Sequence, residues 1–284
     1  LVYSQSSAQS LPIKTGEEPV PLRTLLNDDL QLKLEEVIQS KAKWKSLVAK
    51  KKMAVGLVDL SDPNNIRFAR VNGDEMMYAA SLPKIAVLLA SMDAIDKGEL
   101  KETEEIRKDM KAMIHKSNNQ ATTRMIDRVG FKKIEEIVTN ERYHLYEEDN
   151  GGGLWVGKRY ASSAATKRDP LKNLSHAATV AQVCRFYYLL YQGKLVNEKR
   201  SAQMLDIMVD SGLHHKFINT LDRIAPNAKV YRKSGSWRNY HSDSVLVWGS
   251  PQRRYILVAL IEDDSGEQIM RNLIVPVEKI LNAK

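Results

Sequence analysis

The sequence predicts an α/β (α+β) fold in which one sheet is assembled from both ends of the chain. Strand-like runs occur at 52–62, 65–73, 229–237, 244–250 and 254–263. The chain between these two groups of strands carries mainly helical patterns, so we expect an all-helical part inserted between the two halves of a five-stranded sheet. With 284 residues, of which 43% are hydrophobic, the chain is long enough to bury a sizeable core.

The N-terminal residues 1–28 are rich in Ser, Gln, Pro and Glu, a composition typical of a flexible leader. Their apolar start followed by "SSAQS" is compatible with the remnant of a processed export signal. A helix is expected over 28–47, where acids come early and lysines late, as the helix dipole favours. We therefore predict a flexible leader at 1–28 and one domain at 29–284, with an α/β part at 29–75 and 213–284 and a helical part at 76–212.

The remaining elements are predicted from apolar periodicity and from turn signals. The first two strand-like runs flank the turn signal "DPNN", which predicts a hairpin. Helices are expected at 81–97, 103–117, 119–130, 131–141, 176–194 and 197–211, and at the C-terminus with a bend at Pro276. The stretch 147–175 breaks the helical pattern for almost thirty residues, and connections of that length are often functional.

The composition excludes several classes of protein. No run of about 18 uncharged apolar residues is present, so we expect no transmembrane segment. The net charge of +8 favours a solvated basic surface or contact with a cell wall or membrane surface, as the basic segment 41–52 also allows. A nucleic-acid partner is disfavoured because no base-reading or stacking motif occurs. No histidine spacing typical of metal sites occurs, so we expect no metal and no cofactor. The single cysteine, Cys184, lies in an apolar helical pattern and is expected to be a buried thiol.

The stretch "YAASLPKIAVLLA" (78–90) places Ser81 three residues before Lys84 at the expected start of a buried helix. Positions i and i+3 share one face of a helix, so the hydroxyl and the amine can meet. Pro83 is tolerated in a first turn. A buried lysine has a lowered pKa and can accept a proton from a serine hydroxyl, which is otherwise a poor nucleophile. We predict that Ser81 is a nucleophile and Lys84 its base.

Two further clusters carry polar groups in the right order. "KSNNQ" (116–120) lies in an expected loop between helices, with Ser117 and Asn119 able to point the same way. "RKSGS" (232–236) lies in an expected strand, where a glycine often marks the close approach of a ligand. The order S-x-x-K, S-x-N, K-[ST]-G resembles the triple motif of the penicillin-recognising serine enzymes, the serine β-lactamases and the DD-peptidases. Over about 29–284 the chain is most similar to the class A β-lactamase branch.

The resemblance implies a β-lactamase/transpeptidase-like fold with an antiparallel five-stranded sheet. It also implies an acyl-enzyme at Ser81, with Lys84 as the base directly or through water. Ser117 would relay a proton to the leaving nitrogen. Lys233 would lower the pKa of Lys84 through its like charge and, with Ser234, bind the substrate carboxylate.

Further binding roles follow from the same resemblance. Asn119 would contact the amide side chain of the substrate, and Gly235 would let the substrate lie against the strand. The backbone amides of Ser81 and Ser236 would form an oxyanion hole. Arg238 and His241, which follow the third motif, are candidates for the pocket lining, and Arg238 for assistance in carboxylate binding. The implied substrates are β-lactams and peptidoglycan stem peptides ending in D-Ala-D-Ala, and the implied location is extracytoplasmic, periplasmic or secreted.

The chain departs from the class A pattern at two places. Asn118 stands where an aspartate is usual, which predicts a structural adjustment only. The loop between Gly151 and Asn173 has no glutamate to activate a deacylating water, and Asp169 is its only acid; Glu147, Glu148 and Asp149 lie upstream. We therefore expect β-lactams to acylate Ser81 and leave slowly. A true β-lactamase with a relocated base and a catalytically weak domain that binds wall peptides or a partner remain the alternatives.

Overall fold

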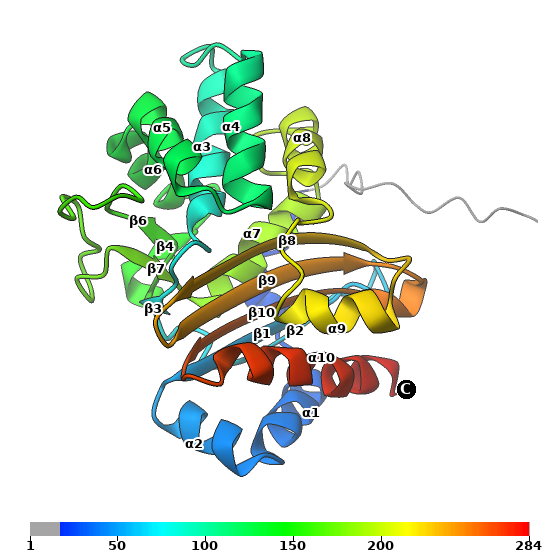
Figure 1. The fold of residues 1–284 in the computed structure, drawn as a ribbon. Coiled ribbons are helices and arrows are strands. Elements are labelled where there is room, and N and C mark those ends of the chain that lie inside the picture. The colour runs from blue at the N-terminus through cyan, green and yellow to red at the C-terminus, as the bar shows by residue number, and fades with distance from the viewer. Residues whose placement is uncertain (1–17, 284) are drawn as a thin grey trace, which may run out of the picture.

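A computed structural model describes residues 18–283, and its centre is a five-stranded antiparallel sheet (Figure 1). The strand order is β2-β1-β10-β9-β8, with bounds β1 (Met53–Asp59), β2 (Arg67–Val71), β8 (Lys229–Trp237), β9 (Tyr240–Trp248) and β10 (Arg254–Glu262). In the register of the central pair, Met53 lies opposite Ile261 and Asp59 opposite Tyr255. The predicted α/β fold, with a sheet built from both chain ends, is therefore confirmed.

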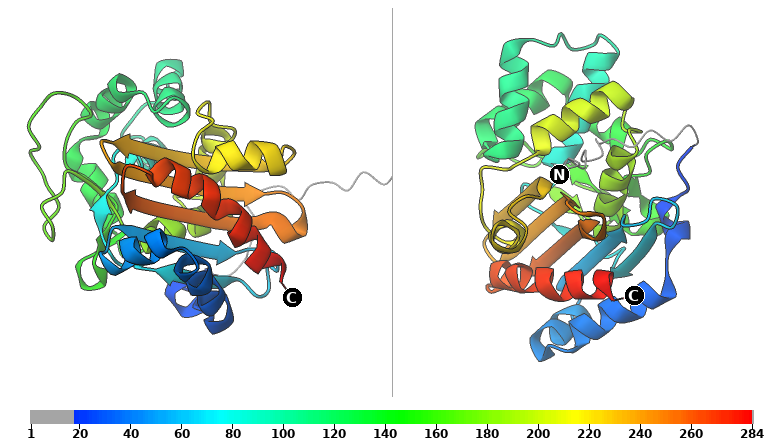
Figure 2. Two further views of the ribbon diagram at one scale, coloured as in Figure 1. Left: turned by 60° about the horizontal axis from the view of Figure 1, so that its bottom comes forward. Right: turned by 90° about the vertical axis from the view of Figure 1, so that its right-hand side faces the viewer.

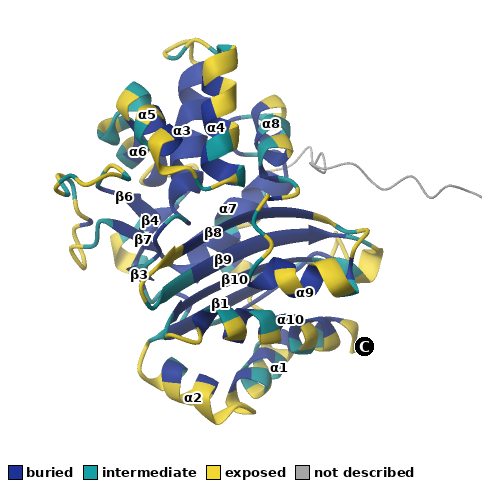
Figure 3. Ribbon diagram, viewed as in Figure 1, coloured by how far each residue is buried: buried dark blue, intermediate teal, exposed yellow. Residues whose placement is uncertain are grey.

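Alternate residues of the central strands enter two separate hydrophobic cores. In β1, Ala54 and Val58 belong to one core, whereas Val55 and Leu57 belong to the other. Successive side chains of a strand point to opposite faces, so a sheet whose strands are apolar at every position must be covered on both sides. Figure 3 shows this burial along the strands.

Helices cover both faces of the sheet (Figure 2). One face carries α1 (Asp28–Gln39), α2 (Ala42–Ala49), α9 (Phe217–Ile224) and α10 (Gly266–Asn282). The other face carries α7 (Val180–Tyr191) and, beyond it, α3 (Lys84–Asp96), α4 (Glu104–His115), α5 (Asn119–Val129), α6 (Phe131–Val138) and α8 (Glu198–Met208).

The helix α7 packs so closely on β1 that the strand requires a glycine. A Cβ at Gly56 would lie 2.6 Å from Sγ of Cys184. Burial raises the pKa of the Cys184 thiol, so the cysteine is a neutral core residue, as expected. Because α7 rests on the sheet, the helical part expected at 76–212 includes one helix that belongs with the sheet layer; the exact domain boundaries stay a prediction.

The helix that carries the first motif begins later than expected. α3 begins at Lys84, and every residue from Lys84 to Ile95 is buried. Ser81 lies in the preceding turn, where its carbonyl accepts from the amide of Lys84 at 3.2 Å. Ser81 and Lys84 therefore do not lie on one face of a helix, as the spacing predicted. Ser81 lies in the turn that leads into α3, and Lys84 is the first residue of α3.

Several other expectations need correction. The expected helix at 28–47 is two helices, α1 and α2, and α9 was not predicted. The helix expected from 176 begins at Val180, after β7 (His176–Ala178). The stretch 147–175 is not without structure, because it contains η2 (Glu148–Asn150), β5 (Gly152–Gly153) and β6 (Trp155–Val156). β5 pairs with β4 (Tyr146–Glu147), and β7 lies between β3 (Met77–Tyr78) and β6. Strands of two or three residues are too short to show a period, so tertiary pairing decides them.

The flexible leader expected at 1–28 is wrong for its last residues. Leu22 is only 2% exposed, within η1 (Leu22–Leu25), and Leu26 forms a bridge with Phe68 of β2. Apolar burial orders this segment despite its composition. Residues 1–17 of the expected leader lie outside the described residues. Within residues 18–283, no helix is both long and apolar enough to span a bilayer.

Candidate active site

The three sequence clusters meet between the edge strand β8 and the start of α3. Ser117 lies in the connection between α4 and α5, and its Oγ accepts hydrogen bonds from Nζ of Lys84 at 3.3 Å and from Nζ of Lys233 at 2.9 Å. Lys84 is the first residue of α3, and Lys233 lies on β8. The structure therefore brings together the predicted base, the predicted proton relay and the second lysine.

The amine of Lys84 is held by the second motif. It donates to the carbonyl of Ser117 at 2.7 Å and to Oδ1 of Asn119 at 2.8 Å. Burial lowers the pKa of Lys84 to about 7, because the charged form loses its hydration. The amine is thus a usable base near neutral pH. The predicted direct bond between this amine and Ser81 is not formed: the Ser81 hydroxyl has no hydrogen-bond partner among the described residues, and it stays free to react.

Lys233 is almost as deeply buried, with 2% of its surface exposed. Its Nζ also donates to the carbonyl of Ser234 at 2.6 Å. Burial lowers the pKa of Lys233 well below its ordinary value, and the positive charge of Lys84 adds to the effect. The charge of Lys84 thus acts on Lys233, whereas the lowered pKa of Lys84 follows from burial; the predicted effect of Lys233 on Lys84 stays a prediction.

The Ser-Asn-Asn sequence of the second motif has a local explanation. Oδ1 of Asn118 accepts from the amide of Ala121 at 2.8 Å and so caps the N-terminus of α5. Asparagine and aspartate are about equally good at this position, so the departure from aspartate leaves the helix intact. The neighbouring Ser117 has a left-handed conformation, with φ of 51°, and Asn119 follows as the first residue of α5.

Gly235 allows β8 to approach the turn that carries the nucleophile. A Cβ at Gly235 would lie 2.5 Å from the amide nitrogen of Ser81 and 2.6 Å from the carbonyl of Ala79. Oγ of Ser242, on the neighbouring strand β9, donates to the same Ala79 carbonyl at 2.8 Å. The close approach expected at this glycine is therefore with the chain's own backbone, and it places the Ser81 amide beside β8.

Behind this strand lies a group of buried charges that no sequence motif predicts. Lys216 is fully buried, and its Nζ donates to Oγ of Ser236 at 2.8 Å and to the carbonyls of Gly235 and Ser242. Burial lowers the pKa of Lys216 to about 8. Arg232 and Asp243 form a fully buried ion pair, with Nε and Oδ1 2.9 Å apart. A lone lysine in "LHHKFIN" carries no motif, so only the fold reveals its position.

The remaining predicted binding residues do not all lie at one place in the structure. Ser234 is buried, and its hydroxyl forms no hydrogen bond within the described part of the chain. Arg238 is exposed at the β8–β9 turn, 5.7 Å from the ring centre of Trp237. His241 packs against the start of α10, since a Cβ at Gly266 would lie 2.6 Å from its ring. The structure therefore does not bring His241 to Ser81, and roles for Arg238 and Ser236 in substrate binding stay predictions.

Two of the predicted acids of the loop region, Asp169 and Glu147, are held by other groups. Asp169 is only 2% exposed, and its carboxylate accepts from the amides of Leu171 at 3.0 Å and Lys172 at 2.9 Å, and also from that of Leu174. Glu147 is held by His144 at 2.9 Å and by Gln182 at 2.8 Å. Glu148 is exposed. Asp169 is thus a structural residue that shapes the loop.

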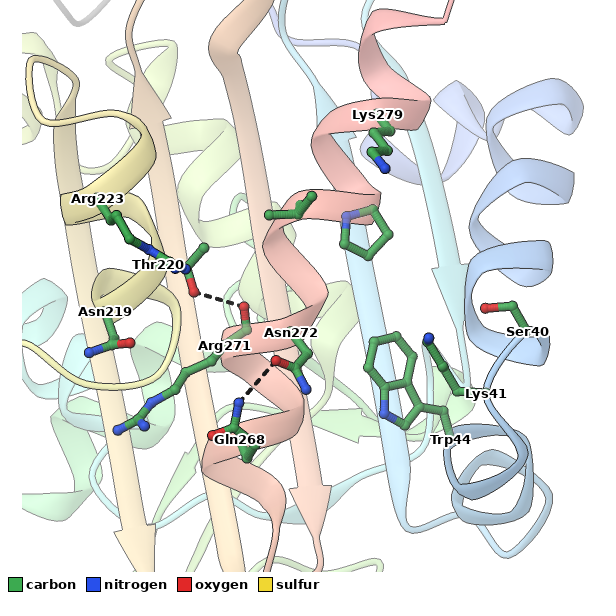
Figure 4. A pocket seen from close by; sticks show the side chains of 12 residues that line it. Ser40, Lys41, Trp44, Asn219, Thr220, Arg223, Gln268, Arg271, Asn272 and Lys279 are labelled. Atoms are coloured by element: carbon green, nitrogen blue, oxygen red, sulfur yellow. Dashed lines mark hydrogen bonds between the residues drawn. The ribbon is translucent and has the colours of Figure 1, made fainter.

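A second recess lies away from this cluster, on the side of the sheet that α9 and α10 cover. It has a volume of about 1020 Å³, and Figure 4 shows Trp44, Arg223, Arg271 and Lys279 around it. Its serine, Ser40, donates its hydroxyl to the carbonyl of Val37 at 2.7 Å, so no free nucleophile is paired with a base there.

Among residues 18–283, no group of three His, Cys, Asp or Glu side chains is placed to hold a metal ion.

Comparison with known proteins finds relatives of similar fold. No curated protein sequence matches the chain. A β-lactamase from Sphaerobacter thermophilus DSM 20745 has a similar fold, with a TM-score of 0.64, 16% identity, and coverage of 83% of this chain and 94% of that one. A class A β-lactamase representative from Bacteroides cellulosilyticus DSM 14838 gives 0.66 at 17% identity, covering 91% and 100%. The structure of PBP-A gives 0.65 at 18% identity, covering 89% and 96%.

The family assignment rests on the sequence profile as well as on the fold. The profile of the beta-lactamase enzyme family matches residues 33–112 and 105–282, which is most of the chain. The matched segments contain all three motifs, whose side chains meet in the structure. The chain therefore belongs to the beta-lactamase enzyme family and is a serine hydrolase.

Proposed function

We propose that this protein forms an acyl-enzyme at Ser81 with peptidoglycan D-Ala-D-Ala-type peptides, and that β-lactams acylate the same serine and leave slowly. One observation carries the proposal. Lys84, Ser117 and Lys233 form a continuous hydrogen-bonded group at the end of the turn that carries Ser81, whereas Asp169 and Glu147 are already bound to other groups. The site thus has the parts for acylation, and neither Asp169 nor Glu147 is available as a base for deacylation.

Acylation follows from the positions of these groups. The Ser81 oxygen attacks the carbonyl carbon, and its proton passes to the neutral amine of Lys84, which must turn from Ser117 toward Ser81. A new ester bond forms as the carbonyl carbon separates from the leaving nitrogen. Ser117 contacts both amines, so it can deliver the proton to that nitrogen. The amides of Ser81 and Ser236 are the candidates to stabilise the oxyanion.

Deacylation is expected to be the slow step. Attack of water on the ester needs a general base, and loss of such a base typically costs about a hundredfold to ten-thousandfold in rate. A mutant of PBP-A was solved as an acyl-enzyme complex with penicillin G, so a protein of this fold can retain such an adduct. The binding of a peptide carboxylate by Lys233 and Ser234, and an extracytoplasmic location, belong to this proposal.

The test is to mix the protein with benzylpenicillin and follow the intact mass over time. We expect a covalent adduct that persists for many minutes and is absent in Ser81→Ala. Ser40→Ala, which removes a hydroxyl of the second recess, is the matched control and should behave like the parent. Rapid turnover above about one per second with no visible adduct would show a β-lactamase with a relocated base. Absence of both adduct and turnover would show a non-catalytic binding domain.

A further inference from the structure

We propose that Tyr160 is a positioning residue that keeps water away from the acyl-enzyme, and this inference rests on the proposed function. Tyr160 belongs to the loop 157–175 between β6 and β7. Its hydroxyl donates to the carbonyl of Ala80 at 2.9 Å. Its ring centre lies 4.5 Å from Nζ of Lys84. One loop side chain therefore touches both the residue before the nucleophile and the base.

The contact with Ala80 acts on the nucleophile's backbone. Ala80 has φ of 49°, a left-handed conformation that costs energy in a residue with a Cβ. The hydrogen bond from Tyr160 fixes the carbonyl of this residue directly before Ser81. Burial raises the pKa of the Tyr160 phenol well above its ordinary value, so the group remains a neutral donor across the physiological range.

The ring acts on the surroundings of the amine. Lys84 is fully buried, and its amine is bounded by Ser117, by Asn119 and by the aromatic face of Tyr160. The ring offers a favourable surface to the charged amine through a cation–π contact but no oxygen that could activate water. On the side that faces the loop, the amine is thus covered by the face of an aromatic ring.

The loop holds Tyr160 rigidly in this position. The Tyr160 ring packs on His176, with ring centres 4.2 Å apart. Nε2 of His176 lies 3.0 Å from the carbonyl of Lys158, and burial lowers the pKa of His176 to about 4, so its ring is neutral. Nε1 of Trp155 donates to the carbonyl of Lys167 at 2.7 Å, and Asp169 binds the amides beyond it. The Tyr160 ring is therefore packed within an extensively hydrogen-bonded loop.

The first experiment separates the hydroxyl from the ring. Tyr160→Phe keeps the ring and loses the bond to Ala80. We expect it to slow acylation by benzylpenicillin about two- to tenfold, the effect of one net hydrogen bond, with adduct decay unchanged. Tyr160→Leu and Tyr160→Ala remove the aromatic cover and admit water to the amine of Lys84, which can then act as its general base, so we expect adduct decay to accelerate at least about tenfold. Decay at the parental rate in both truncated variants would overturn the proposal.

A second readout needs no acyl-enzyme. The rate at which sulfo-NHS-acetate modifies Lys84 is measured by peptide mass mapping, with buried Lys216 as the internal reference for global opening. We expect Lys84 to be modified about tenfold faster or more in Tyr160→Leu and Tyr160→Ala, with Tyr160→Phe like the parent and Lys216 unchanged throughout. Equal Lys84 labelling in all variants would contradict a covering role. If the parent formed no penicillin adduct, the proposed function would fail, yet this labelling would still decide whether Tyr160 covers the amine.

Tyr146→Phe is the matched control for both measurements. Tyr146 is also aromatic and borders the same loop, and its hydroxyl lies 3.4 Å from Asp169 rather than near Lys84. We expect this variant to acylate, deacylate and label like the parent. A change in Tyr146→Phe as large as that in Tyr160→Leu would show that loop order in general, rather than the Tyr160 ring, controls the site.

Discussion

Lys84 and Lys233 direct their amines at one acceptor, Oγ of Ser117, at 3.3 Å and 2.9 Å. Both lysines are buried. Two ammonium groups that share one acceptor in a poorly hydrated site repel each other, and the charge of Lys84 favours the neutral form of Lys233. The shared hydroxyl therefore links the two lysine amines, so that their titrations are coupled. The protonation state of this pair should govern the rate of acylation.

The rate of acylation should rise with pH through about 7. Burial lowers the pKa of Lys84 to about 7, and only the neutral amine can accept the Ser81 proton. Below that pH the amine is charged and the rate falls; above it the rate levels off. Quenched-flow mass spectrometry with benzylpenicillin from pH 5 to 9 measures this profile. Lys84→Met should acylate about a hundredfold to ten-thousandfold more slowly, and a flat parental profile would argue against Lys84 as the base.

Stability should increase with pH on the alkaline side of neutrality. The pKa of Lys84 is about 7 in the folded protein and near 10.4 in an unfolded chain. Between these values the unfolded chain binds the proton and the folded protein does not, so the free energy of unfolding rises with pH. In Lys84→Met the slope should fall by up to about 1.4 kcal/mol per pH unit. Urea unfolding at pH 7.5 to 9.5 measures both slopes, and equal slopes would mean that Lys84 is charged in the fold.

Gly235→Ala should damage both the fold and the activity. The added methyl would lie 2.5 Å from the Ser81 amide nitrogen, so the strand or the nucleophile turn must shift. We expect a loss of about 1–3 kcal/mol in unfolding free energy and slower acylation. Gly249→Ala is the control, because its methyl would meet nothing closer than 3.4 Å. Thermal unfolding and acylation rates of the two variants should differ clearly; similar values would weaken the assigned close approach.

Asp169→Asn separates a structural acid from a catalytic one. Asp169 accepts from three backbone amides, so a neutral amide should loosen the loop and cost about 1–3 kcal/mol. Asp149→Asn, at an exposed acid upstream, should have no measurable effect on stability. Denaturant unfolding and adduct lifetime are measured together. A normal unfolding midpoint with a much longer-lived adduct would identify Asp169 as the deacylating base instead.

The chemistry-bearing part of the site could be predicted because it lies in short motifs. Ser81, Ser117 and Lys233 each sit in a local pattern whose order along the chain is informative, and their elements were also expected from apolar periodicity. Asn118 could be placed beside them, although its capping role depends on where α5 begins. Direct contact between Lys84 and Ser81 was expected from a helical spacing that the turn at 81–83 replaces.

Other parts of the site carry no such pattern. Lys216 and Tyr160 are single residues in irregular segments, and only long-range pairing brings them to β8 and α3. His241 was expected at the pocket because it follows the third motif. Side chains alternate along a strand, and this alternation turns His241 toward α10 instead. Local motifs therefore predict which residues a segment contributes, but the tertiary contacts of those residues depend on the fold.

The strand order also has a consequence for how the protein is made. The edge strand that carries Lys233 reaches β1 only through β9 and then β10, which is among the last elements of the chain. During synthesis, Ser81 and Ser117 leave the ribosome long before the sheet can close, and pairing so distant in sequence forms slowly. A nascent chain arrested before β10 would contain all three motifs and would not be acylated at Ser81.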